Sequence, residues 1–193
     1  KNAWLKVLTS QFPDKPKEEI RILDIGTGPG FFPVILAEAG YHVDAVDYTE
    51  GMLEKAKENA GNLCRNIRFL RMDAQKLNFE DNTFDVVISR NLTWNLEHPD
   101  VAYREWVRVL KVGGRLLNFD ANWYGYLYEE EQRKAYENDR KNVENNSLDD
   151  HYLCTDIERM ERIALQVPLS KISRPQWDVK TLREAGLLGI RTD

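Results

Sequence analysis

A glycine-rich turn with acidic residues on both sides is the part of this sequence best suited to chemistry. It reads Asp24-Ile25-Gly26-Thr27-Gly28-Pro29-Gly30, and Asp47 follows about 20 residues later. Glycines let a backbone turn tightly and approach a ligand closely, and the start of a following helix offers unpaired N–H groups. A carboxylate at the spacing of Asp47 can accept hydrogen bonds from ribose hydroxyls. The pattern predicts a nucleotide-type pocket.

Alternating strands and helices must position these residues. Short apolar runs predict parallel strands, and longer apolar periodic runs predict helices. The expected strands are Ile20–Ile25, Tyr41–Asp47, Ile67–Met72, Asn82–Ser89 and Arg115–Phe119. The expected helices between them are Phe31–Ala39, then Glu50–Ala60 capped by Thr49 with Met52 facing inward, and one from Pro99 that ends at Gly113-Gly114. This alternation predicts an α/β fold with a doubly wound, mostly parallel sheet, whose carboxyl strand ends share one rim.

The chain outside these elements breaks the alternation. An amphipathic helix is expected at the start, with Trp4, Leu5, Leu8 and Phe12 on one face. Residues 121–178 are expected to form a helical insertion after strand five. Its helices are predicted at Tyr126–Val143 and from a Thr155-x-x-Glu158 capping box to about Gln166, joined by a mobile link at Asn145–Asp150. A helix at Val179–Ala185 and a sixth strand at Leu187–Arg191 complete the expected order.

These residues resemble a known family, the class I S-adenosylmethionine-dependent methyltransferases, in particular the small-molecule, quinone-biosynthesis-like type 11 domain. The glycine motif, Asp47 closing strand two, Asp73-Ala74 closing strand three and strand four match the family pattern in order. The resemblance implies a Rossmann-like methyltransferase fold and S-adenosyl-L-methionine as cofactor, with S-adenosyl-L-homocysteine as product. It implies the cofactor-binding residues Asp24, Gly26, Thr27, Gly28, Gly30, Asp47, Tyr48, Asp73, Ala74, Ser89 and Arg90.

Each implied role has a plainer alternative. By resemblance Asp73 takes the adenine amino group and Ala74 offers an N–H, but an Asp after a strand often only caps a turn. Asp24 is expected to accept hydrogen bonds from turn N–H groups, because a buried carboxylate is costly without them. Ser89 and Arg90 end strand four, where the resemblance implies backbone contacts to the methionine part, although Arg90 can equally be a surface cation. Asp47 can be a solvated loop acid.

Polar and aromatic residues on the acceptor side complete the site. Asn91, Trp94, Asp120, Trp123 and Tyr124 are the candidate substrate residues, since small-molecule pockets combine apolar walls with a few polar groups. Trp94 and Trp123 can equally be core aromatics. Strand four ends in Ser89-Arg90-Asn91-Leu92, not in the Asn/Asp-Pro-Pro-Tyr/Phe motif of nucleic-acid and protein amine methyltransferases. No catalytic side chain is identified, and His151 is the only histidine placed to swing over an acceptor.

Composition narrows the function classes. The chain has 193 residues, 42% of them hydrophobic, which suits one globular domain over 1–193, and the resemblance implies that it is a single methyltransferase domain. A net charge of −5 argues against nucleic-acid binding. Cys64 and Cys154 suit neither a disulfide framework nor a metal site, so a cytoplasmic location is expected. No apolar run reaches the roughly 18 residues of a membrane span.

The function expected from this combination is methyl transfer to a small-molecule acceptor by in-line displacement, catalysed mainly by proximity and orientation. The alternatives are a nicotinamide-dependent oxidoreductase, which shares the glycine loop and ribose acid, and a non-catalytic S-adenosylmethionine-binding protein. The acceptor atom and oligomeric state are open. The family's sheet has the order 3-2-1-4-5-7-6. With Leu187–Arg191 assigned to strand six, no seventh strand remains, so a truncated C-terminus is expected.

Overall fold

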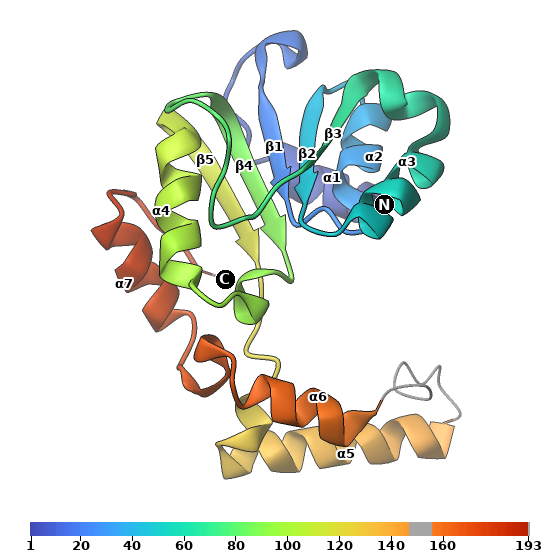
Figure 1. Cartoon of the computed structure of the whole chain (residues 1–193), viewed down its shortest axis with the longest axis vertical. Helices are drawn as coiled ribbons and strands as arrows, with labels where there is room; N and C mark the ends of the chain where they lie inside the picture. The colour runs from blue at the N-terminus through green and yellow to red at the C-terminus, as the bar shows by residue number, and fades with distance from the viewer. Residues whose placement is uncertain (147–155, 193) are drawn as a thin grey trace.

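The computed structural model describes residues 1–146 and 156–192. A five-stranded sheet of order β3-β2-β1-β4-β5 forms its centre, and every neighbouring pair is parallel. The strands are β1 (Ile22–Ile25), β2 (Val43–Asp47), β3 (Ile67–Arg71), β4 (Phe84–Arg90) and β5 (Leu110–Phe119). From β1 the chain adds β2 and β3 on one side, and it then returns to add β4 and β5 on the other side of β1 (Figure 1). The predicted doubly wound α/β fold is therefore confirmed.

Helices cover both faces of the sheet. One face carries α1 (Asn2–Thr9), α2 (Phe31–Glu38) and α3 (Glu50–Ala60), and the other carries α4 (Pro99–Val109) and α7 (Gln176–Glu184) (Figure 1). Strand β4 is buried from Phe84 to Ser89 and contributes to the apolar cores on both faces. Its continuous apolar run is what a strand covered on both faces requires. This two-sided burial fixes the strand ends that carry the site.

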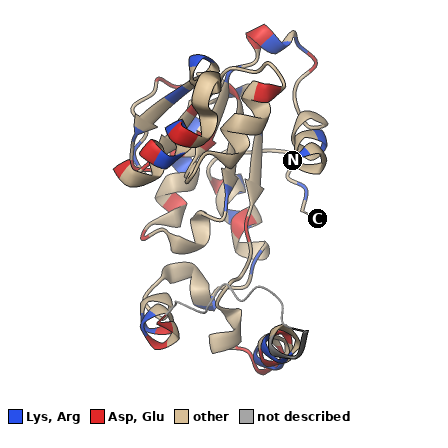
Figure 2. Ribbon diagram, turned by 90° about the vertical axis from the view of Figure 1, so that its right-hand side faces the viewer, with Lys and Arg blue, Asp and Glu red and all other residues tan. Residues whose placement is uncertain are grey.

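A helical insertion follows β5. It contains the 3₁₀ turn η4 (Gly125–Leu127), α5 (Glu130–Asn146), α6 (Ile157–Ala164) and the 3₁₀ turn η5 (Pro168–Lys171). Figure 1 shows α5 and α6 beyond the end of the sheet to which β4 and β5 point. Figure 2 shows basic and acidic residues side by side on these helices, as expected for a largely solvated surface. The insertion thus lies at the rim where the predicted site residues meet.

Several local predictions were wrong. Helix α4 ends at Val109, and Gly113 and Gly114 lie inside β5, where the pairing with β4 shifts register. The positive φ of Gly113, 79°, explains why a glycine stands at this irregularity. Met52 is 45% exposed and does not face the core. Asp156 caps α6 by accepting from the Arg159 N–H at 2.9 Å, in place of the predicted Thr155.

The predicted sixth strand is also absent from the described part of the chain. Residues 187–191 form no strand, and β5 is the last strand of the sheet on that side. Gly186 and Gly189 both have positive φ, 99° and 66°, so the segment bends where a strand would have to be extended. Residues 147–155 lie outside the described residues, and the predictions for His151 and for most of the Asn145–Asp150 link fall there.

Candidate cofactor and acceptor site

The glycine turn between β1 and α2 has the backbone that its sequence predicted. Gly26, Gly28 and Gly30 have φ of 69°, 52° and 84°, a region that side chains with a Cβ avoid. A Cβ at Gly30 would lie 2.9 Å from the Cβ of Ala56, so this glycine allows α2 to approach α3. A Cβ at Gly28 would meet nothing within 4 Å. The turn therefore packs against α3 at Gly30, whereas at Gly28 it borders free space.

Asp47 holds the open part of the turn in place. Its Oδ2 accepts from the Gly28 N–H at 2.8 Å, and its Oδ1 accepts from the Thr49 N–H at 2.9 Å. Thr49 begins α3 without a side-chain cap bond, so the cap predicted for Thr49 is not formed, and Asp47 instead orders the turn before the helix. Asp47 is only partly buried and keeps lone pairs available for further donors. It is a structured residue of the turn, not a freely solvated loop acid.

Asp24 lies beneath the same turn and is almost fully buried. Burial raises the pKa of the Asp24 carboxyl to about 7, the Thr27 side chain offsets this in part, and the nearby charge of Asp47 raises the pKa further. The predicted hydrogen bonds from turn N–H groups to Asp24 are not present among the described residues. Two carboxylates thus share one turn, which creates a negative region suited to a cationic ligand group.

The ends of β2 and β3 carry the other residues predicted for the nucleoside. Tyr48 is 67% exposed, and the Arg71 guanidinium lies 5.8 Å from the centre of its ring. Asp73 Oδ1 accepts from the Gln75 N–H at 2.8 Å, which is the turn-capping arrangement considered as its alternative role. Ala74 is buried, and its carbonyl accepts from the Trp106 indole at 2.9 Å. These contacts fix the strand ends, and the Tyr48 ring stays mostly exposed with Arg71 beside it.

The end of β4 lies next to the glycine turn. Ser89 pairs in register with Ile25 and donates its hydroxyl to the Ile25 carbonyl at 3.1 Å. Arg90 lies over the rings of Trp4, Phe31 and Phe32, at 5.3, 5.3 and 5.7 Å from their centres. Asn91 has a positive φ of 53°, and its N–H donates to the Phe119 carbonyl. The predicted residues of this strand end are therefore brought together at the β1 side of the rim.

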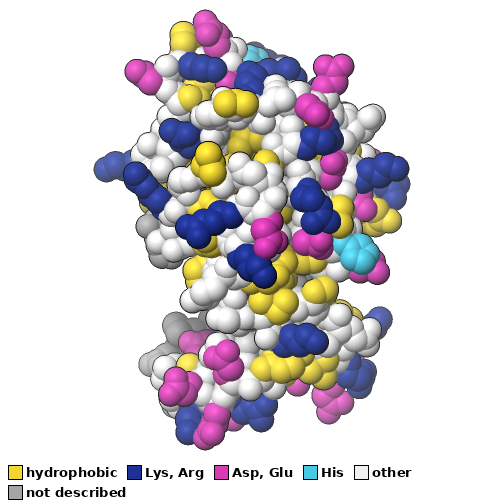
Figure 3. Space-filling model, turned by 90° about the vertical axis from the view of Figure 1, so that its left-hand side faces the viewer, with side chains coloured by type: hydrophobic (Ala, Val, Ile, Leu, Met, Phe, Trp, Pro, Cys, Tyr) yellow, Lys and Arg dark blue, Asp and Glu magenta, His cyan; other side chains and the backbone are white. Residues whose placement is uncertain are grey.

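Trp94 and Tyr124 line a cleft on the side of the rim where the acceptor residues were predicted. Trp94 lies in the 3₁₀ turn η3 (Thr93–Asn95), and its ring centre is 5.3 Å from that of Tyr124. The cleft has a volume of about 440 Å³, and α6 supplies its other wall. Its lining residues are Trp94, Asn95, Tyr124, Asp156, Arg159, Met160, Ile163 and Ala164. Trp123 does not line it and is 49% exposed. Figure 3 shows the molecule narrowing between the sheet body and the insertion.

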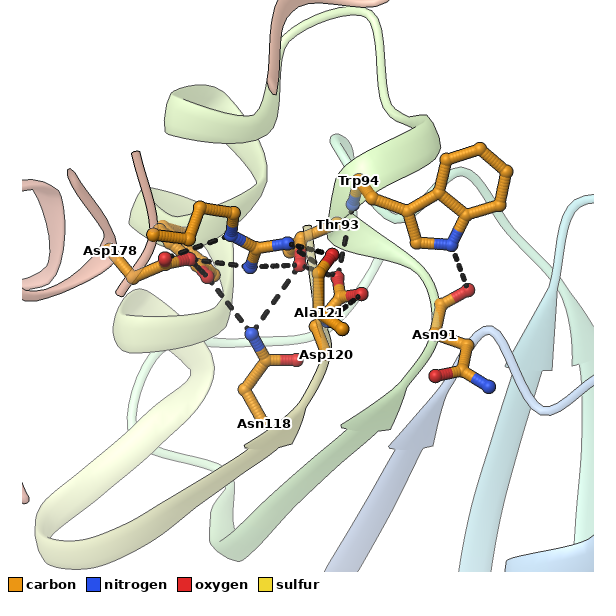
Figure 4. A network of polar contacts seen from close by, with 9 residues as sticks. Asn91, Thr93, Trp94, Asn118, Asp120, Ala121 and Asp178 are labelled. Atoms are coloured by element: carbon orange, nitrogen blue, oxygen red, sulfur yellow. Dashed lines mark hydrogen bonds and ion pairs between the residues drawn. The ribbon is translucent and has the colours of Figure 1, made fainter. Parts of the chain in front are cut away.

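Asp120, predicted on the acceptor side, is engaged in a buried polar network instead. Its carboxylate accepts from the Trp94 N–H at 3.0 Å and from the Thr93 hydroxyl, and it pairs with Arg174 at 3.1 Å (Figure 4). Arg174 also pairs with Asp178 at 2.6 Å and donates to the Thr93 hydroxyl at 2.9 Å. The side chains of Asp120 and Arg174 are 2% and 6% exposed. Asp120 therefore positions η3 and is not free to hold an acceptor.

Arg174, Thr93 and Asp178 were missed by the sequence analysis. Tyr103 and Asn118 extend their network, because Tyr103 donates to Asp178 and Asn118 donates to Tyr103 at 2.9 Å (Figure 4). The one available signal was the spacing of Arg174 and Asp178, four residues apart and thus on one side of a helical turn. Nothing in the sequence indicated that this pair would meet Asp120.

The chemistry of the turn fits S-adenosylmethionine. The Thr27 hydroxyl is buried beside the Asp24 carboxyl and has no other hydrogen-bond partner among the described residues. The space at Gly28 admits a ligand against the backbone. The Asp24 and Asp47 carboxylates suit a ligand that carries cationic groups and ribose hydroxyls.

Within residues 1–146 and 156–192, no helix is both long enough and apolar enough to cross a membrane.

Comparison with known proteins agrees with this geometry. Residues 23–118 match the family described as "Methyltransferase domain". A demethylmenaquinone methyltransferase of Clavibacter sepedonicus is 39% identical over 97 residues, which are 50% of this chain and 39% of the relative. A ubiquinone/menaquinone biosynthesis C-methyltransferase of Xanthomonas campestris is 33% identical over 137 residues, covering 66% of this chain and 53% of the relative. The chain thus spans about half the length of the curated relatives it matches, or less.

Solved structures share the same fold. An S-adenosylmethionine-dependent methyltransferase from Mesorhizobium loti matches with a TM-score of 0.54 and 25% identity, over 64% of this chain and 56% of that one. The [4+2]-cyclase SpnF matches with a TM-score of 0.55 and 25% identity, over 60% and 43%. The fold, the glycine turn and the matched sequence together identify the family. Through residues 23–118, this chain belongs to the class I S-adenosylmethionine-dependent methyltransferases.

Proposed function

We propose that the chain binds S-adenosylmethionine over the Gly26–Gly30 turn and transfers its methyl group to a small-molecule acceptor in the cleft beside Trp94. The cofactor assignment rests on the hydrogen bond from the Gly28 N–H to Asp47. This bond orders a carboxylate that can accept from ribose hydroxyls, next to a glycine that has free space beside it. The family membership of residues 23–118 supports the same assignment.

The residues of the chain have distinct proposed roles. Asp47 accepts ribose hydroxyls, Tyr48 offers its exposed ring to the adenine, and Asp73 with Ala74 borders the base. Gly26, Gly28, Gly30, Thr27, Asp24, Ser89 and Arg90 surround the methionine part. The cofactor supplies an activated methyl group, so the protein needs to hold the acceptor in line and exclude water. Orientation of this kind is worth up to roughly 7 to 11 kcal/mol. No catalytic base is assigned.

The acceptor is proposed to be a flat, mainly apolar molecule. Trp94 and Tyr124 give the cleft aromatic walls, and Met160 and Ile163 add apolar surface from α6. The curated relatives are named for quinone-pathway methylation, which favours a quinone-like ring as the acceptor. Because α6 forms one wall, the insertion at 121–178 is proposed to act as a lid over this cleft.

Calorimetry with S-adenosylhomocysteine and NADH tests the cofactor assignment. The proposal expects S-adenosylhomocysteine to bind at one site per chain and NADH to give no measurable heat at the same concentrations. Tight NADH binding with no response to S-adenosylhomocysteine would instead support the oxidoreductase alternative.

One alternative has a specific observation in its favour. The similar structure named as a [4+2]-cyclase shows that this fold does not by itself determine the reaction. The chain could therefore bind the cofactor without transferring its methyl group. Incubation with methyl-labelled S-adenosylmethionine and demethylated quinones, followed by mass spectrometry, separates the two: labelled product supports transfer, and its absence despite cofactor binding supports the alternative.

A further inference from the structure

Arg90 occupies an unusual position at the end of β4. It extends from the same face of the sheet as Val86 and Ile88, which pack in the core formed with α1 and α2. Its guanidinium is surrounded by the rings of Trp4 from α1 and of Phe31 and Phe32 from the start of α2. The side chain is partly buried. Arg90 is therefore not a freely solvated surface cation.

The guanidinium of Arg90 has no counter-charge within residues 1–146 and 156–192. No carboxylate or carbonyl there accepts a hydrogen bond from it. Other partly buried arginines in the same ranges are paired: Arg174 with Asp178 and Asp120, and Arg108 with Glu105 and Asp81. Interaction with aromatic faces attracts a cation but leaves its N–H donors unused. The donors of Arg90 remain available to an external acceptor.

The surroundings of Arg90 also favour an anion. Phe31 and Phe32 are the first two residues of α2, so the rings that hold the guanidinium belong to the first turn of that helix, whose start carries a partial positive charge. Their backbone N–H groups have no acceptor among the described residues, and the next residue, Pro33, has no N–H. A cation at this end of a helix is unfavourable unless an anion lies between them. Two independent features therefore point to one negatively charged group.

A negatively charged residue, Asp24, lies on β1, the strand next to β4. Asp24 pairs in register with Ile88, two residues before Arg90, so Asp24 and Arg90 extend from the same face of adjacent strands without forming an ion pair. Asp24 and Asp47 suit cationic groups, and Arg90 suits an anionic one. The methionine part of the proposed cofactor carries an ammonium and a carboxylate, together with the sulfonium. The polarity of the site matches this arrangement of charges.

We propose that the Arg90 guanidinium, held by the rings of Trp4, Phe31 and Phe32 beside the start of α2, binds the carboxylate of the cofactor's methionine part. This inference rests on the proposed function, and it adds the side chain that would recognise an intact amino-acid group. Arg90 acts in it as a specificity-determining residue for the cofactor. It makes no bond to the transferred methyl group.

Calorimetry with two ligands tests the assignment. The ligands are S-adenosylhomocysteine and its decarboxylated form, which keeps the adenosine, thioether and amine. In the unmodified protein, loss of the ligand carboxylate is expected to weaken binding about 10- to 100-fold, as for a charged hydrogen bond. Arg90→Gln is expected to weaken S-adenosylhomocysteine by a similar factor and to leave the decarboxylated ligand within about twofold, because the two changes remove the same contact.

Two further variants test whether the planar guanidinium of Arg90, and not positive charge in general, binds the ligand. Arg90→Lys keeps the charge but loses the planar fork, so it is expected to restore only part of the affinity for S-adenosylhomocysteine. Arg115→Gln removes one positive charge from an exposed position on β5, where Arg115 contacts only the carbonyls of Gly113 and Gly114 among the described residues. It is expected to bind both ligands like the unmodified protein.

Each remaining outcome counts against the assignment. If Arg90→Gln weakens both ligands equally, the side chain supports the fold of the site and does not bind the carboxylate. If it weakens neither, Arg90 has no contact with the ligand. In both cases the proposed cofactor survives. An unmodified protein that binds neither ligand would overturn the proposed function, and the role of Arg90 with it.

Discussion

Asp24 and Asp47 illustrate how much one short turn determines at the scale of single residues. Asp47 was predictable, because its place at the end of a strand about 20 residues after a glycine motif follows from the geometry of a βαβ unit. Its bond to the Gly28 N–H was not, because the sequence does not reveal which way a turn N–H points. The burial of Asp24 was expected from the apolar strand around it, but its raised pKa depends on the nearby charge of Asp47 as well.

The raised pKa of Asp24 has a consequence for stability. The carboxyl has a pKa of about 7 in the folded chain, against 3.8 for an exposed aspartate. Its favourable contribution is therefore present below pH 4 and is lost as the pH rises through 7. Asp24→Asn, which cannot ionise, is expected to gain up to about 4 kcal/mol of unfolding free energy over the unmodified protein at pH 8, and much less at pH 5.

Urea unfolding at the two pH values measures this difference. The matched control is Asp44→Asn on β2, whose carboxylate pairs with Arg68 at the surface side of the sheet. It is not expected to gain stability at high pH. A gap between Asp24→Asn and the unmodified protein that stays the same at pH 5 and pH 8 would contradict a raised pKa for Asp24.

At the scale of elements, apolar patterns located the five strands and their helices, because the apolar runs and the glycines between them predict the same boundaries. The predictions failed where a glycine has two possible uses. Gly113 and Gly114 were taken as a helix end, but they relieve a register shift inside β5, and Gly186 and Gly189 break what was expected to be a sixth strand. Patterns read along the chain do not show contacts such as Arg174 with Asp120, because those residues are brought together only by the fold.

The start of β4 is held by a second charged group, at the end of the sheet opposite the cofactor turn. Asp85 accepts from Lys15 at 2.6 Å, from Lys111 at 2.7 Å and from the Arg21 N–H at 3.1 Å. Burial would raise the pKa of the Asp85 carboxyl, but the bonds from Lys111, Lys15 and the Arg21 N–H outweigh it and lower the pKa to about 2. The resulting stability is present above pH 4 and is lost as the pH falls toward 2.

Asp85→Asn is expected to cost about 2 kcal/mol of unfolding free energy at pH 7, with the difference from the unmodified protein shrinking below pH 4. Urea unfolding between pH 2 and pH 7 measures it. Asp14→Asn, an exposed neighbour of Lys15, is the control and should leave stability within about 0.5 kcal/mol. An Asp85→Asn deficit that persists unchanged at pH 2 would show that the lost charge is not its cause.

Arg174 joins the end of the insertion to β5, η3 and α7. Arg174→Met is expected to cost about 3 to 5 kcal/mol, because it leaves the buried carboxylates of Asp120 and Asp178 without a cation. Lys171→Met, at an exposed position three residues earlier, is the control. Thermal and urea unfolding measure both variants. A loss below 1 kcal/mol for Arg174→Met would mean that the network contributes little to holding the insertion against the sheet.

At the scale of the whole molecule, the sheet gathers the ends of β1, β2 and β4 into one rim and the insertion adds an aromatic cleft next to it. The places of the residues predicted for the cofactor could be foreseen, since they lie in the glycine turn, on β1 or at strand ends, but their contact with a cofactor stays a prediction. The acceptor side was predictable only in part. Trp94 and Tyr124 line the cleft, whereas Asp120 belongs to the Arg174 network and Trp123 faces outward. The α6 wall could not be foreseen, because the insertion has no regular pattern that fixes its position.

The central claim is that the Gly26–Gly30 turn and Asp47 hold S-adenosylmethionine, and the affinity of Asp47→Ala for S-adenosylhomocysteine tests it most directly. The account predicts that this variant binds S-adenosylhomocysteine at least about tenfold more weakly than the unmodified protein, because it loses the ribose acceptor and the bond that orders Gly28. Circular dichroism should show the same fold for both. An Asp47→Ala variant with the affinity of the unmodified protein would contradict the assignment of this turn as the cofactor site.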